Sequence, residues 1–161
     1  MKIFAFLLLA TVATASAISA LDGKTLVKGL FEGLATKEDI EKLTECADDS
    51  VVGDWKSMIA ALKEIRYFGE HANALLGLSK AIKPAFSTII MVIGCSTGDL
   101  PDLLEKFKKV VSDPDKFIKQ VELNIDFVQV GLPEVISLWD AEDYEICAKV
   151  LGALMKYVFD G

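Results

Sequence analysis

The sequence predicts an all-α fold, a single bundle of about six to eight amphipathic helices with no sheet. Apolar residues recur at the 3.6-residue spacing of a helix in nearly every segment. Acidic residues at or close before a proline and a Thr-Lys-Glu-Asp stretch supply typical helix start signals. The chain has 161 residues, 52% of them hydrophobic, which is enough for one buried core and too short for two full domains.

The first half of the chain carries four apolar stripes at helical spacing, over residues 26–34, 40–47, 51–68 and 72–82. Residues 36–39 resemble a capping box and open the second of these helices. Asp49 or Ser50 can cap the third helix, and Gly69 is expected to end it. Pro84 removes a backbone donor, so we expect a kink or break there before an apolar segment that ends at Ile93.

The second half begins with two helices whose start signals are an acidic residue close to a proline, at Asp99 with Pro101 and at Asp113-Pro114. Pro133 is expected near the start of a short element, and residues 144–158 form the clearest stripe. Residues 121–127 alternate like a strand but also fit a helix. We favour the helix, because no second alternating run exists to pair with a strand.

The N-terminus has the plan of a signal peptide, with Lys2 followed by a short apolar run and then small residues. Cleavage is expected after Ala17 or Ala15, so residues 1–17 would be the signal peptide and 18–161 the helical domain. The alternative is an uncleaved anchor, but the apolar run is shorter than the roughly 20 residues of a membrane span. We expect a protein that is secreted or held in the lumen of secretory vesicles.

Charge and motif content point away from several functions. The formal net charge is −7, or −8 once Lys2 is removed, so nucleic acids and anionic membrane surfaces are not expected partners. The apolar segment that ends at Ile93 is too short to span a membrane. No Gly-rich phosphate loop, Gly-x-Ser-x-Gly elbow or Ser-x-x-Lys motif occurs. We therefore expect no enzyme activity, no cofactor and no metal centre.

Three cysteines, Cys46, Cys95 and Cys147, allow three different single disulfides. Cys46 lies near a helix end and Cys95 at the edge of a loop, which favours a bridge between those two. Cys147 lies within the apolar stripe of the last helix, where a free buried thiol behaves as a small hydrophobe. A Cys/His nucleophile is not expected, since His71 is the sole histidine and is interpreted as solvated or capping.

An acidic cluster precedes the last helix, at Asp140, Glu142, Asp143 and Glu145. Negative charge at a helix N-terminus is favoured by the helix dipole, and this is the preferred interpretation. The alternative is a weak calcium site, although the run lacks the residue pattern of an EF-hand.

Several short stretches resemble a family of small secreted all-helical proteins of unknown function associated with ciliates. The resemblance rests on residues 26–34, on Cys46 to Asp49, on a mid-chain cysteine at Cys95 and on residues 143–152. It covers most of the chain after the signal peptide, implies a secreted helical domain and supplies no catalytic residues.

Residues 29–33 contain a Gly-x-x-x-Gly motif, for which two interpretations stay open. The glycines could let another helix approach closely, or they could simply fray a short helix.

Two functions from different classes remain. The first is a structural, cargo or interaction role in secretory vesicles or outside the cell, based on acidity, the signal peptide and the lack of a site motif. The alternative is an extracellular carrier of an apolar ligand, such as a fatty acid or another lipid, held in the bundle core. It is based on broad apolar arcs and the expected break at Pro84.

Overall fold

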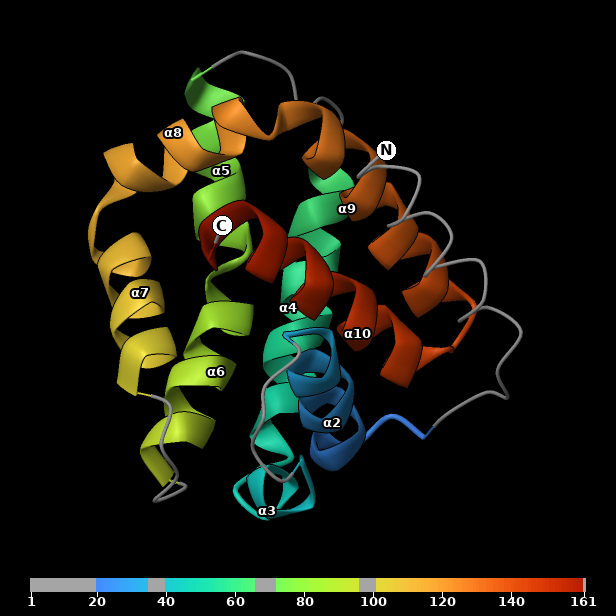
Figure 1. Ribbon diagram of the computed structural model, residues 1–161. Coiled ribbons are helices and arrows are strands. Elements are labelled where there is room, and N and C mark those ends of the chain that lie inside the picture. Colours follow the sequence, from blue (N-terminus) through green and yellow to red (C-terminus); the bar gives the residue numbers. More distant parts are fainter. Residues whose placement is uncertain (1–19, 35–39, 66–71, 96–100, 161) are drawn as a thin grey trace.

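The computed structural model describes residues 20–34, 40–65, 72–95 and 101–160 (Figure 1). Within these ranges the chain forms nine α-helices, a short π-helical turn and no strand, so the predicted all-α fold is confirmed. The helices are α2 (Gly23–Gly33), α3 (Ile40–Thr44), α4 (Ser50–Glu64), α5 (Ala72–Ala81), α6 (Lys83–Cys95), α7 (Pro101–Ser112), α8 (Pro114–Leu123), α9 (Ile125–Asp140) and α10 (Tyr144–Met155), with the π-helical turn at Lys156–Asp160.

The helices form two groups on either side of α4 (Figure 1). Helices α5, α6, α7 and α8 lie together on one side, where α5 packs on α8 and α6 packs on α7. Helices α2, α9 and α10 lie on the other side, where α10 packs on both α2 and α9. Because α4 contacts members of both groups, its apolar stripe forms the centre of the core.

The core is rich in large side chains that are almost completely buried. Trp55 of α4 is 0% exposed, and its indole Nε1 donates a 3.0 Å hydrogen bond to Thr88 Oγ1 of α6. A cluster of aromatic rings joins α6, α7 and α8 to the C-terminal turn, through Phe86, Phe107, Phe117 and Phe159. Phe86 is central, with ring centroids 5.4 Å from Phe107 and 5.3 Å from Phe159. One continuous apolar cluster thus connects both groups of helices.

The predicted break near Pro84 is confirmed. Helix α5 ends at Ala81 and α6 begins at Lys83, which places Pro84 in the first turn of α6, where a missing N–H does no harm. The segment with strand-like alternation is helical, as favoured, and is divided between α8 and α9 at Asn124. Asn124 caps the end of α8 with a backbone bond from its N–H to the Val121 carbonyl.

The expectation that Pro133 starts a short element is wrong. Pro133 lies inside α9, a helix of 16 residues. The buried residues of α9 recur on one side of the helix on both sides of the proline, whereas Pro133 itself is exposed. The proline ring therefore lies away from the core, and packing of the buried side on the core keeps the helix continuous.

The start of α8 agrees with expectation, whereas the cap and the end of α4 differ from it. Asp113 caps α8 as predicted, and its carboxylate accepts a 3.2 Å bond from the Lys116 N–H. Asp49 stands at the N-cap of α4 but makes no cap bond there; its Oδ1 accepts from the Gly23 N–H of α2 instead, at 3.2 Å. Helix α4 ends at Glu64, earlier than its stripe predicted, because Ile65 turns to extended backbone.

Several predictions concern residues outside the described ranges. They are the signal peptide (1–17), the capping box (36–39), the helix-ending Gly69, His71 and the cap at Asp99.

Candidate functional site

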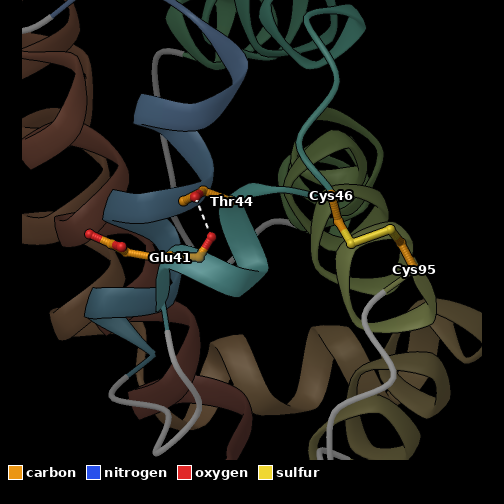
Figure 2. Close-up of a disulfide and its surroundings, with 4 residues drawn as sticks. All are labelled: Glu41, Thr44, Cys46 and Cys95. Carbon is orange, nitrogen blue, oxygen red and sulfur yellow. Dashed lines mark hydrogen bonds between the residues drawn. A yellow bond between two sulfur atoms is a disulfide. The ribbon is translucent and has the colours of Figure 1, made fainter.

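A disulfide joins Cys46 and Cys95, the pair that their positions near element ends favoured (Figure 2). The two Cα atoms are 5.8 Å apart, within the usual range for a disulfide. Cys46 lies two residues after the end of α3, and Cys95 is the last residue of α6. Beside it, the Thr44 hydroxyl donates a 2.7 Å bond to the Glu41 carbonyl and closes the short α3 (Figure 2). The bridge therefore anchors a five-residue helix to the core.

Cys147 is a free thiol in the interior of α10 and is 0% exposed. Its Sγ donates a hydrogen bond to the Val135 carbonyl of α9 at 3.2 Å. Burial raises the pKa of the Cys147 thiol far above its usual value, and the nearby carboxylate of Asp143 adds to the effect. A neutral, enclosed thiol is a poor nucleophile, so this side chain contributes to packing.

The acidic residues before α10 are divided among separate environments. Asp140 pairs with Lys63 of α4 at 2.6 Å, and Glu145 pairs with Lys28 of α2 at 3.2 Å. Glu142 is exposed, with left-handed backbone (φ 61°) at the turn between the two helices. No group of three or more His, Cys, Asp or Glu side chains in the described part of the chain could hold a metal ion. The structure thus places Asp140 and Glu145 in ion pairs with lysines of two other helices.

Asp143 is the buried member of this group, at 6% exposed. Its Oδ1 has no hydrogen-bond partner among the described residues. Burial raises the pKa of the Asp143 carboxyl, and the negative charge of Glu145 raises it further. The residue is therefore a source of pH-dependent stability.

Among the described helices, α2 and α10 make the most extensive contact, along a seam of small residues. A Cβ atom added at Gly29 would overlap the Glu145 carbonyl, and one added at Gly33 would overlap the Lys149 carbonyl. From the other side, a Cβ at Gly152 would overlap the Leu30 carbonyl. The Gly-x-x-x-Gly motif thus serves close packing, the first of the two open interpretations, and its partner Gly152 was not identified from the sequence.

Ion pairs border this seam on both sides. Lys28 reaches Glu145 at 3.2 Å, and Lys149 reaches Glu32 at 4.0 Å. Both pairs are partly exposed, so they contribute little stability individually but fix which faces of α2 and α10 meet.

The hollows at the surface of the described residues include two of different character. The larger, about 510 Å³, is an open polar groove between α2, α3 and the start of α10, with carboxylates of Asp22, Glu32, Glu41, Glu45 and Glu145 along it. The smaller, about 120 Å³, lies between α5, α6, α7 and α8 and has mainly apolar walls. Typical pockets for drug-sized ligands measure roughly 300–1,000 Å³, so the smaller cavity is too small for a whole lipid.

Comparisons with protein-family models, with curated proteins and with solved structures found no match. Among the described helices, none combines the length and the apolar character that crossing a membrane requires.

Proposed function

We propose that this protein is a secreted or vesicle-lumenal, non-enzymatic helical protein with a structural, cargo or interaction role. The observation that carries the proposal is the Cys46–Cys95 disulfide, which anchors α3 to α6. Disulfides persist in oxidising compartments and are rare in reducing ones, so a structural bridge of this kind fits the secretory route. The expected signal peptide and the resemblance to secreted helical proteins also support a protein of the secretory route.

The non-enzymatic part of the proposal is supported by the state of the reactive side chains. The Cys147 thiol is enclosed and hydrogen-bonded to a main-chain carbonyl. Asp140 and Glu145 are engaged by lysines of other helices. These side chains stabilise the fold, and a cargo or structural protein requires a stable folded domain with an acidic surface.

Expression of the full chain in a secreting eukaryotic cell tests the compartment. We expect the protein in the medium, beginning near residue 16 or 18, with the disulfide formed and Cys147 free. A matched Leu8→Arg variant interrupts the apolar run and should remain inside the cell. Protein that stays in the cytosol, begins at Met1 and is fully reduced would contradict the proposal.

The cargo role can be tested through calcium. Acidic lumenal proteins condense when divalent cations neutralise their charge, and this chain carries 24 acidic against 17 basic side chains. We expect the purified mature protein to sediment as calcium chloride rises through the millimolar range. Sodium chloride of equal ionic strength is the control. Equal sedimentation in both salts would overturn the condensation role.

The alternative function, carriage of a fatty acid or another lipid, is supported only by the small cavity between α5 and α8. Solvent extraction of the secreted protein followed by mass spectrometry separates the two functions. We expect an empty protein, because the cavity of about 120 Å³ does not accommodate a long acyl chain. A stoichiometric bound lipid would support the carrier function instead.

A further inference from the structure

The small cavity has an apolar inner end and a basic mouth. Phe86, Val110 and Phe117 are 2%, 2% and 3% exposed, so they form its inner end. Lys80 of α5 and Lys83 of α6 also line the cavity, and both are exposed, which places them at its mouth. Among the described residues, the lining includes two lysines and no acidic side chain.

The two lysines come together because of the break between α5 and α6. Lys80 lies in the last turn of α5 and Lys83 is the first residue of α6, on either side of the break that precedes Pro84. Neither forms an ion pair with another described residue. Asp113, the acidic residue next to the lining Pro114, is already engaged as the cap of α8 through the Lys116 N–H.

The surrounding charge also favours an anion. Residues 72–123, which form the four helices around the cavity, contain seven lysines and six acidic residues. The rest of the chain after residue 17 contains nine basic and eighteen acidic residues. This segment, about a third of the chain, therefore repels a small anion least, and the two lysines make the cavity mouth locally basic.

The volume limits the apolar part of a ligand. An apolar cavity of about 150 Å³ takes up benzene, so one of about 120 Å³ holds a short alkyl chain or a small ring. The walls of Phe86 and Phe117 suit such a group, while a carboxylate at the mouth would receive charge-assisted hydrogen bonds from the lysines.

We infer that the cavity between α5, α6, α7 and α8 is a binding site for a small amphipathic monocarboxylate, with its apolar tail among Phe86, Val110 and Phe117 and its carboxylate at Lys80 and Lys83. This inference does not depend on the proposed structural role. It agrees with the empty protein expected above, because a small, exchangeable ligand would be lost on purification. It also differs from the lipid-carrier function, since a long acyl chain exceeds the cavity.

Titration of the mature protein with hexanoate, followed by nuclear magnetic resonance, tests the site. We expect saturable binding below about 10 mM, since a ligand of so few atoms reaches affinities near the millimolar range. Two probes of the same chain length, 1-hexanol and hexylammonium, should bind at least about tenfold more weakly, because they lack the anion that the lysines recognise.

The variant Lys80→Gln/Lys83→Gln should weaken hexanoate binding at least about tenfold and leave 1-hexanol binding unchanged. The matched control is Lys42→Gln/Lys56→Gln, which removes the same charge from exposed positions of α3 and α4 and should bind like the original chain. Val111→Phe, which fills the cavity from its half-buried edge, should abolish binding of both hexanoate and 1-hexanol.

The inference is overturned by three results: no saturable hexanoate binding, equal affinity for hexanoate and 1-hexanol, or an unchanged affinity in the Lys80/Lys83 variant. If Val111→Phe fails to fold, as judged by circular dichroism, the lysine variants and the uncharged probe still decide the question.

Discussion

Thr88 supplies the hydrogen-bond acceptor for the buried indole of Trp55. Its Oγ1 accepts from Trp55 Nε1 at 3.0 Å and donates to the Pro84 carbonyl at 2.8 Å. Without Thr88 the buried Trp55 indole N–H would have no acceptor, at a cost of roughly 1–3 kcal/mol. Thr88 is 4% exposed, so water does not replace it.

We expect Thr88→Val to lower the free energy of unfolding by about 1–3 kcal/mol, since the shape is kept while the Trp55 indole loses its acceptor. Urea unfolding followed by tryptophan fluorescence measures the change. Ser87→Ala, at the exposed neighbouring position, is the control and should stay within about 0.5 kcal/mol. Equal effects of the two substitutions would show that the buried bond contributes nothing.

Asp143 is expected to make stability fall as pH rises. Because burial raises its pKa in the folded chain, the folded state holds this proton more tightly than the unfolded state. The resulting stabilisation is fully present below the ordinary carboxyl pKa and is lost as pH rises through the raised value. Most carboxylates, which pair with cations, have the opposite dependence.

Asp143→Asn removes this titration. Unfolding free energies measured from about pH 3 to pH 7 should show the variant gaining stability relative to the original chain as pH rises. Asp54→Asn, exposed in the middle of α4, should show no such trend. A stability difference for Asp143→Asn that is constant with pH would contradict the argument.

At the scale of elements, the α2–α10 seam depends on the absence of side chains. Gly33 and Gly152 let the two backbones approach until a Cβ at either position would overlap a carbonyl of the other helix. By contrast, Gly53 in α4 has open space around its Cβ direction. The same substitution should therefore have opposite effects at the two kinds of position.

We expect Gly33→Ala to lower the free energy of unfolding by about 1–3 kcal/mol or more, because α2 and α10 must separate to admit the methyl group. Gly53→Ala should instead raise it by about 0.5–1 kcal/mol, since alanine loses less backbone entropy in a helix. Thermal and urea unfolding measure both. A stabilising Gly33→Ala would show that the seam is looser than described.

The helices themselves were predictable because their apolar periodicity and the Asp113-Pro114 start signal are local. The path of α9 through Pro133 was not, since it depends on the proline facing solvent and on packing across the core. The role of Gly29 and Gly33 was equally open, because their partner Gly152 lies at the far end of the chain.

For the candidate site, too, only the features with a local signal in the sequence could be predicted. The positions of Cys46 and Cys95 near element ends favoured their pairing, and the apolar stripe of α10 indicated a buried Cys147. The acidic cluster was local in sequence, but the lysines that divide it, Lys28 and Lys63, come from distant helices. Pairwise contacts between remote segments leave no local pattern in a single sequence.

For the whole molecule, the disulfide links positions 49 residues apart and should contribute about 4 kcal/mol in the chain-entropy model. The Cys46→Ser/Cys95→Ser variant should unfold at correspondingly lower urea concentration while keeping its helical circular dichroism. The reduced original chain, whose Cys147 is intact, should match it. Equal stability of the oxidised and reduced chains would show that the bridge is dispensable.

The α2–α10 seam also orders events during synthesis. The bridge-forming cysteines and all the helices from α2 to α9 emerge before α10, so oxidation can occur on a chain whose tightest interface does not yet exist. Because domains fold as units, docking of α10 would complete the fold only after α2 to α9 have been synthesised. A nascent chain arrested before Tyr144 would therefore expose the apolar faces of α2 and α9 that α10 covers, and would bind chaperones that recognise exposed apolar surface.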